Sequence, residues 1–275
     1  MSDYRLLCVD IDGTLHNSAH QITPGVKKAL QQVVKERNMT VALSSGRISS
    51  NLVLEQAELG VNGPIISFGG AYVLDEGNVI FSRSISCRTA ASVLDYARER
   101  NLSAFIYRRE HWYAEQHGWW FDHEERITRV PGIAGSFTDL LASWEEKGWE
   151  PNKLLLMSRD TTALEDAYKG LSQVCGRDEA FLMLSSPRYL EIMPPHTDKG
   201  TGLTALARHR DIDTSRVIAI GDYYNDLGMF RDAGLSIAMG NAPDDVKAQA
   251  DHVTLTCDED GVAQALYDLG IIEKK

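Results

Sequence analysis

The sequence predicts an α/β protein in which a doubly wound, Rossmann-like parallel sheet is interrupted by an inserted α/β domain. Short apolar runs that end in small or acidic residues occur near both ends of the chain, and helix-like segments separate them. The middle of the chain has a different texture, rich in aromatic residues. With 275 residues, the chain is long enough for one large domain or two smaller ones.

The first elements alternate between strand and helix. Thr23 and Pro24 predict a helix start, with threonine as the cap and proline in the first turn, and apolar residues follow at helical spacing. The predicted elements are, in order, strand 6–9, the helix from Pro24, strand 39–43 and strand 64–68. This alternation is typical of a parallel sheet covered by helices.

The same alternation returns near the C-terminal end. A helix-like segment, 202–209, precedes strands predicted at 216–220, 235–239 and 252–256. In open sheets of this kind, ligands bind outside the carboxyl ends of the strands. Polar residues stand just past several of these ends, and we expect them to converge: Asp10, Asp12, Ser45, Gly46 and Asp222.

The middle of the chain predicts a separate α/β domain. Its expected elements are helix 88–101, strand 104–107, strand 153–157, helix 160–174 and strand 181–184, and three of the five tryptophans lie in 111–123. We therefore predict a core made of 1–83 and 190–275 and an inserted domain at 84–189. The strand at 189–193 is expected to return the chain to the core.

Composition excludes several classes of function. A formal net charge of −11 argues against a general affinity for nucleic acid or for an anionic membrane. The four cysteines form no CxxC pair, which fits a reducing compartment. No apolar stretch approaches the ~20 residues of a membrane span, and the N-terminus does not read as a secretory signal. A cytoplasmic protein is expected.

Three aspartates at strand ends, Asp10, Asp12 and Asp222, provide the oxygen ligands that Mg²⁺ prefers. An aspartate pair after a strand is more often a turn or cap feature, but an acidic residue at another strand end favours a metal site. Lys199 would offset negative charge there, although a single lysine is usually solvated. Ser45 and Gly46 offer a hydroxyl and an unhindered N–H for a phosphate.

The segment GDYYND, 221–226, places three polar side chains in one loop and the turn after it. Asn225 follows Asp222 by three residues, so both can face one ligand. Asp226 would either bind the metal or orient Lys199. The alternative is a helix cap, with Asp222 as the capping residue.

Four motifs occur in order along the chain: DIDGT, the turn Ser45-Gly46-Arg47, Lys199-Gly200 and GDYYND. With them the chain resembles the haloacid dehalogenase-like phosphatases, specifically the Cof-type branch with a large α/β cap inserted after the third core strand. The resemblance covers essentially the whole chain and includes AMGNA at 238–242 and DEDGVA at 258–263.

The resemblance implies a phosphoaspartate mechanism on a small phosphorylated metabolite, such as a sugar phosphate or a phosphorylated cofactor. Asp10 would be the nucleophile, and Asp12 would protonate the leaving alcohol and then activate water. Mg²⁺ would be bound by Asp10, the backbone carbonyl of Asp12 and Asp222, and Lys199 would assist. The groups that would hold the phosphoryl oxygens are Ser45, the backbone of Gly46 and Asn225.

Some features depart from the family pattern or leave alternatives open. Gly69 stands where that branch usually has asparagine, and this leaves one polar contact near the substrate in doubt. Thr14 is expected to brace its loop. Substrate-selecting residues of the cap are not assigned, and its aromatics are expected to build its own core. The alternative functions are a phosphosugar mutase and a non-catalytic protein that binds phosphorylated metabolites.

Overall fold

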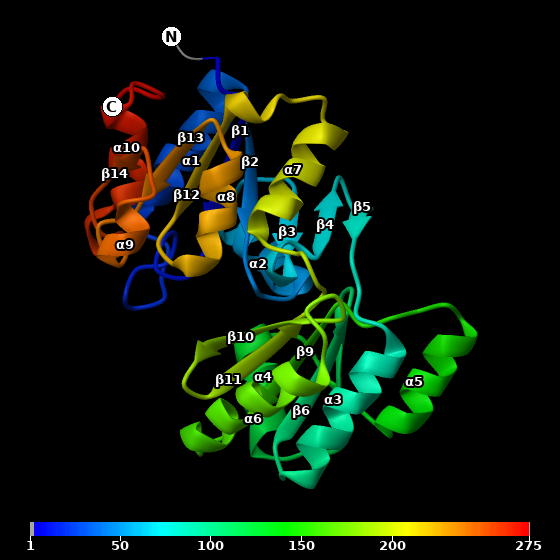
Figure 1. The fold of residues 1–275 in the computed structure, drawn as a ribbon. Coiled ribbons are helices and arrows are strands. Elements are labelled where there is room, and N and C mark those ends of the chain that lie inside the picture. The colour runs from blue at the N-terminus through cyan, green and yellow to red at the C-terminus, as the bar shows by residue number, and fades with distance from the viewer. Residues whose placement is uncertain (1–2, 275) are drawn as a thin grey trace. The chain divides into compact units, whose positions relative to one another are not determined.

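The computed structural model describes residues 3–274, which form two compact units (Figure 1). The core unit contains the chain up to Phe81 and from Asp198 onward, and the cap unit contains Ser82–Thr197. Both ends of the chain therefore belong to the core unit, as the blue and red segments of Figure 1 show. This arrangement confirms the predicted fold class.

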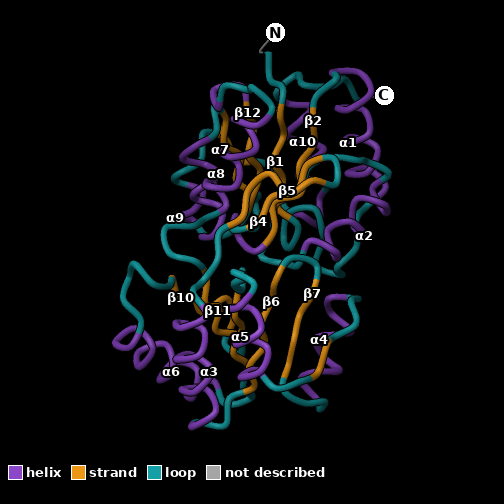
Figure 2. Tube along the Cα trace, turned by 90° about the vertical axis from the view of Figure 1, so that its right-hand side faces the viewer, coloured by secondary structure: helices purple, strands orange, loops and turns teal. Residues whose placement is uncertain are grey.

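The core sheet has eight strands in the order β14-β13-β12-β1-β2-β3-β4-β5. Figure 2 draws strands in orange and labels β12, β1 and β2 of this sheet. Neighbouring strands from β14 to β3 run parallel, and β4 is antiparallel to β3. The strands are β1 Leu6–Asp10, β2 Thr40–Ser44, β3 Ile65–Ser67, β4 Tyr72–Asp75, β5 Asn78–Ser82, β12 Val217–Gly221, β13 Leu235–Ala238 and β14 His252–Val253.

Helices cover both faces of this sheet. Leu7 and Val9 of β1 pack in an apolar cluster with α1, α2 and α10, whereas Leu6 and Cys8 pack in a second cluster with α7, α8 and α9. A strand buried on both faces needs a continuous apolar run, which explains the sequence of β1. The helices are α1 Pro24–Arg37, α2 Ser49–Leu59, α7 Lys199–His209, α8 Leu227–Asp232, α9 Asp244–Lys247 and α10 Gly261–Asp268.

Two helix starts are set by their capping residues. Thr23 accepts a hydrogen bond from the Val26 N–H at 3.2 Å, and Pro24 occupies the first turn, as predicted. Helix α7 begins at Lys199, three residues before the expected 202. The reason is a capping box, in which Asp198 accepts from the Thr201 N–H at 2.8 Å and the Thr201 side chain bonds the Asp198 backbone.

The cap unit is built on a six-stranded sheet in the order β10-β11-β9-β6-β7-β8. Helices α3, α5 and α6 contribute to its apolar core. The strands are β6 Ser103–Arg108, β7 His111–Ala114, β8 Ile133–Ala134, β9 Lys153–Met157, β10 Phe181–Ser186 and β11 Tyr189–Met193, and the helices are α3 Cys87–Glu99, α4 Trp119–Thr128, α5 Phe137–Glu146 and α6 Thr161–Val174.

The predicted return to the core at residue 190 is wrong. Strand β11 pairs antiparallel with both β9 and β10, so it lies inside the cap sheet. The chain leaves the cap unit only after Thr197. The sequence of an apolar strand does not indicate which sheet contains it. That depends on the strands with which it pairs, and here these are β9 and β10.

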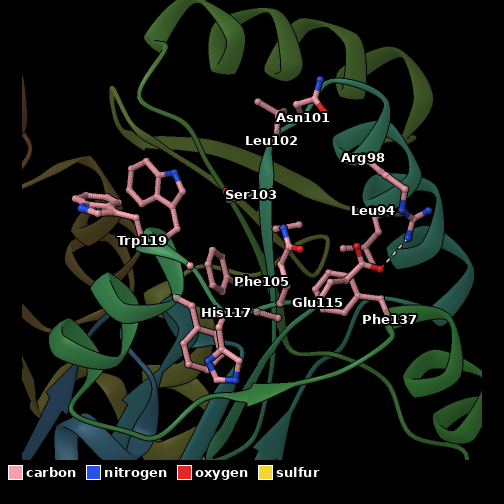
Figure 3. Close-up of a pocket in the computed structure, with 16 residues that line it drawn as sticks. Leu94, Arg98, Asn101, Leu102, Ser103, Phe105, Glu115, His117, Trp119 and Phe137 are labelled. Carbon is pink, nitrogen blue, oxygen red and sulfur yellow. Dashed lines mark hydrogen bonds and ion pairs between the residues drawn. The ribbon is translucent and has the colours of Figure 1, made fainter.

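The aromatic segment of the cap divides between core and surface. Trp112 is fully buried and packs against Phe121 with ring centroids 4.8 Å apart, whereas Trp119 is 49% exposed. Trp119 also lies at a pocket of the cap unit, together with His117 and Phe105 (Figure 3). Hence only part of this segment builds the cap's own core.

Within residues 3–274, no helix has both the length and the apolar character needed to cross a membrane.

Candidate active site

The site lies at the carboxyl end of β1, the strand that is flanked by β2 on one side and β12 on the other. Strands β2 and β3, which come next in the chain, lie on one side of β1, and the later strands β12 to β14 lie on the other side. Such folds bind ligands at this switch point in strand order. Asp10 is the last residue of β1 and pairs in register with Ser44 of β2. Asp222 follows β12 directly.

Lys199 is the central cation of the site. Its side chain is 1% exposed, and Nζ donates hydrogen bonds to Asp10 and, at 2.6 Å, to Oδ1 of Asp226. A lysine in the first turn of a helix opposes the helix dipole, and burial of its charge is costly. Burial alone would lower the pKa of Lys199, but the carboxylates of Asp10 and Asp226 raise it above its ordinary value. The lysine is therefore held as a cation.

Asp226 positions this lysine. While Oδ1 accepts from Lys199, Oδ2 accepts from the backbone N–H groups of Asp222 at 2.9 Å and Tyr223 at 3.0 Å. Of the two roles considered for Asp226, the geometry favours the orientation of Lys199, and Asp222 is not the helix cap that the sequence allowed.

Asp222 is fixed by the loop that follows β1. Its Oδ1 accepts from the Thr14 hydroxyl at 3.1 Å, so Thr14 braces the loop as expected. Its Oδ2 accepts from Asn241 at 3.3 Å, and the same amide donates to the Gly13 carbonyl at 2.9 Å. Gly13 has a φ of +79°, and a Cβ there would lie 2.3 Å from Oδ2 of Asp222. Only glycine permits this approach.

Asn241 has a structural role that the sequence reasoning did not assign. Its side chain accepts from the Cys257 N–H at 2.9 Å while it donates to the Gly13 loop. It belongs to the AMGNA segment, which was matched to the family without a role. That match to the family was the only feature of the sequence that pointed to Asn241.

Three carboxylates share the one lysine. Oxygen atoms of Asp10, Asp222 and Asp226 all lie within 4.8 Å of one another. Burial, opposed by Lys199, raises the pKa of Asp10 well above its ordinary value. Burial, and next the neighbouring Asp226, raises the pKa of Asp222 to about 6. When all three carboxylates are ionised, their negative charge exceeds the single positive charge of Lys199.

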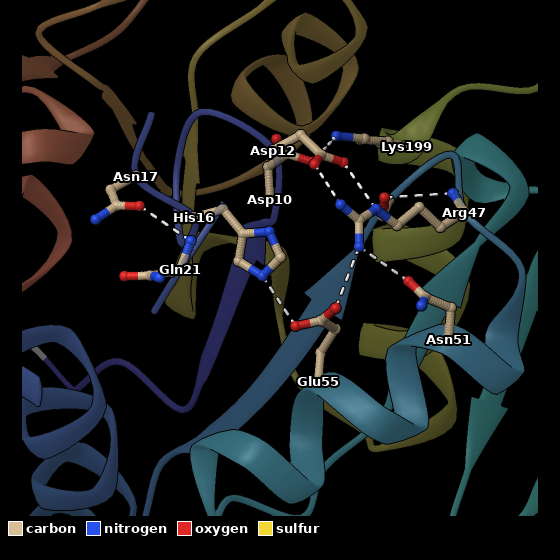
Figure 4. A network of polar contacts seen from close by, with 10 residues as sticks. Asp10, Asp12, His16, Asn17, Gln21, Arg47, Asn51, Glu55 and Lys199 are labelled. Carbon is tan, nitrogen blue, oxygen red and sulfur yellow. Dashed lines mark hydrogen bonds and ion pairs between the residues drawn. The ribbon is translucent and has the colours of Figure 1, made fainter. Parts of the chain in front are cut away.

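The side chain of Asp12 takes part in further polar contacts, which Figure 4 draws next to Asp10 and Lys199. Its carboxylate pairs with Arg47 through two hydrogen bonds, of 2.9 Å to Nε and 2.5 Å to Nη2. Arg47 also donates to Asn51 at 2.9 Å and to Glu55 at 3.1 Å. Glu55 is buried and bonds Nε2 of His16 at 2.9 Å. Arg47 was noted in the sequence only as part of a turn, and His16 and Glu55 were missed.

The predicted phosphate-holding residues lie at the same edge of the core sheet. Ser45 and Gly46 follow β2, and the Ser45 carbonyl accepts from the Gly69 N–H at 3.0 Å. Gly69 has a φ of +58°, so it serves the backbone turn there and has no side chain to contact a ligand. Asn225 lies between Asp222 and α8, and within residues 3–274 its buried Oδ1 has no hydrogen-bond partner.

Comparison with known proteins identifies the family of this chain. A family model described as haloacid dehalogenase-like hydrolase matches residues 7–266. An HMP-PP phosphatase of Yersinia pestis is 27% identical, with 96% of this chain and 94% of the relative covered. The 5-amino-6-(5-phospho-D-ribitylamino)uracil phosphatase YwtE of Bacillus subtilis is 29% identical, with 96% and 98% covered.

A solved structure shows the same fold over nearly the whole chain. A haloacid dehalogenase-like hydrolase from Bacteroides thetaiotaomicron superimposes with a TM-score of 0.84 at 29% identity, covering 97% of this chain and 99% of that one. The chain therefore belongs to the haloacid dehalogenase-like hydrolases, and within them to the Cof-type phosphatases, as its motifs predict.

Proposed function

We propose that this enzyme is a Mg²⁺-dependent phosphatase that hydrolyses small phosphorylated metabolites through an aspartyl-phosphate on Asp10. The observation that carries the proposal is the buried contact between Lys199 and Asp10 inside a cluster of three carboxylates. Such a cluster is costly to a fold, and phosphoryl transfer requires it because an anionic nucleophile must approach an anionic phosphate.

The donor set fits Mg²⁺. Carboxylate and carbonyl oxygens are its preferred ligands, and Lys199 can balance only one negative charge when all three carboxylates are ionised. Asp10, Asp222 and the backbone carbonyl of Asp12 would hold the ion. Bound there, it would neutralise charge on the nucleophile and on the phosphoryl group.

The chain's own residues would divide the reaction into two displacements. In the first, an oxygen of Asp10 bonds to phosphorus, the phosphorus–oxygen bond of the ester breaks, and Asp12 gives a proton to the departing alcohol. In the second, Asp12 takes a proton from water, whose oxygen bonds to phosphorus and releases phosphate and the free Asp10 carboxylate. Lys199 remains charged throughout and stabilises both anionic transition states.

Ser45, Gly46 and Asn225 would hold the other phosphoryl oxygens. The hydroxyl of Ser45 and the N–H of Gly46 are donors at the end of β2. The unpartnered amide oxygen of Asn225 supports its role, because rotation of the amide plane exchanges oxygen and nitrogen and presents a donor to a phosphate. The ribitylaminouracil phosphatase is named for a small phosphorylated metabolite, which supports the same substrate class here.

The test is phosphate release from a panel of phosphorylated metabolites, with and without Mg²⁺, by the full chain and by the variant Asp10→Asn. We expect metal-dependent turnover that is lost in the variant. A folded protein that releases no phosphate from any compound would contradict the proposal. Turnover that persists in Asp10→Asn would contradict the assigned nucleophile.

A further inference from the structure

His16 is a buried histidine whose environment resembles that of a metal ligand. The side chain is 4% exposed, its Nε2 bonds the carboxylate of Glu55 at 2.9 Å, and its Nδ1 is buried without a hydrogen-bond partner within residues 3–274. A carboxylate that accepts from one ring nitrogen holds the proton there, so the other nitrogen presents a lone pair. Histidines that bind metals are typically arranged in this way.

Two further residues with possible ligand atoms, Asp12 and His20, lie near the imidazole of His16. One ligand atom each of Asp12, His16 and His20 can be chosen so that all three lie within 4.8 Å of one another. Asp12 and His20 are exposed, so an ion has access from solvent to a histidine that is otherwise buried. Figure 4 shows the ring of His16 joined to Glu55 through one nitrogen, while the other ring nitrogen points away from Glu55.

A short loop holds His20 in place. The Asn17 carbonyl accepts from the His20 N–H at 2.9 Å, and the Asn17 side chain accepts from the Gln21 N–H at 2.9 Å. The Asn17 N–H in turn donates to the Gln21 carbonyl at 3.0 Å. The loop therefore folds back on itself and returns His20 toward Asp12.

We propose that Asp12, His16 and His20 form an inhibitory binding site for a transition-metal ion, with Zn²⁺ as the best match. Two imidazoles and one carboxylate are ligands that zinc prefers and Mg²⁺ does not. Asp12 and Glu55 bring two negative charges against the one positive charge of Arg47, so the local charge favours a cation. A carboxylate has about four lone-pair positions, so Asp12 can bind an ion while it remains paired with Arg47.

The inhibitory part rests on the proposed function. A carboxylate of Asp12 bound to zinc cannot carry the proton to the leaving alcohol or take it from water. The site is separate from the carboxylates of Asp10, Asp222 and Asp226, so the two ions would bind to different side chains.

Binding is tested by calorimetric titration of the full chain with Zn²⁺ in millimolar Mg²⁺, which saturates the carboxylate cluster. We expect one zinc site, and we expect His20→Ala and His16→Leu each to raise its Kd at least ~10-fold. Glu55→Gln should weaken binding as well, because it disturbs the proton on His16. His111→Ala, at an exposed histidine of the cap unit, is the matched control and should bind zinc as the unmodified chain does.

His20→Ala keeps the test decisive if the buried substitution at His16 prevents folding, because His20 is exposed. No zinc binding in the unmodified chain, or equal Kd values in His20→Ala and the control, would overturn the site. Phosphate release is measured in the same series. Zinc inhibition near the measured Kd that is relieved in His20→Ala supports the inhibitory role. Zinc binding with undiminished turnover overturns that role while the site itself stands.

Discussion

Replacement of Lys199 by methionine tests the electrostatic account of the site. Methionine has a similar shape, so the main change is loss of the cation between Asp10 and Asp226. Removal of one partner of a buried ion pair costs about 3–5 kcal/mol. At pH 8, above the pKa of about 6 of Asp222, we expect the free energy of unfolding to fall by about that amount.

The assay is urea denaturation followed by far-UV circular dichroism, without added metal. With a slope of ~2–3 kcal/mol per molar urea, the midpoint should fall by roughly 1–2 M. At pH 5 the difference in midpoint between Lys199→Met and the unmodified chain should be smaller, because the carboxylates that lack a counter-charge take up protons. Lys169→Met, at an exposed lysine, is the control and should change stability by less than ~0.5 kcal/mol.

A second variant separates charge from packing. Asp226→Asn in the Lys199→Met background removes one of the three carboxylates and keeps an oxygen to accept the N–H bonds of its loop. The double variant should recover part of the lost stability. Equal midpoints for Lys199→Met and the unmodified chain at pH 8, or a double variant less stable than the single one, would refute the reasoning. Phosphate release should fall by about 10²–10³ in both.

Three further predictions follow from the contacts of Asp222. The pKa of Asp222 is raised from 3.8 to about 6, so the folded chain binds a proton there more tightly than the unfolded chain does. The free energy of unfolding of the metal-free chain should therefore fall by up to about 3 kcal/mol as pH rises from 4 to 8. Denaturation across that range should show this fall, and saturating Mg²⁺ should flatten it. Gly13→Ala places a methyl group against Asp222 at a φ of +79°, and turnover should drop ~100-fold with an unchanged circular-dichroism spectrum. Thr14→Val removes the 3.1 Å hydrogen bond to Asp222 and should weaken Mg²⁺ binding ~10-fold by calorimetry, whereas Thr14→Ser should retain it.

Sequence reasoning reached the fold and the polar residues at the strand ends because both depend on local patterns. The apolar run of β1 and the cap at Thr23 are readable in a few neighbouring residues. Strand β11 was assigned to the wrong sheet because pairing with β9 and β10 depends on residues distant in sequence. The fold brings Asp10 and Lys199 together across 189 positions, and only the family motifs anticipated that contact.

The contacts among polar side chains were less predictable than their identities. Arg47 was visible beside Gly46, but its pairing with Asp12 depends on how the turn after β2 faces the loop after β1. His16 and Glu55 are 39 positions apart, and neither belongs to a motif. In the folded chain both side chains are buried and hydrogen-bonded to each other, and Glu55 also accepts from Arg47.

The division of the core unit by the insertion has a consequence for synthesis on the ribosome. Strand β1 needs β12 along one edge, yet 206 residues separate the last residue of one from the first of the other, so early in translation that edge is unpaired. The cap unit is one continuous segment, Ser82–Thr197, and can complete its own sheet first. All five tryptophans of the chain lie in that segment. On a stalled nascent chain, a native-like tryptophan signal should therefore appear before any phosphatase activity, since Lys199 and Asp222 emerge only after the whole cap unit.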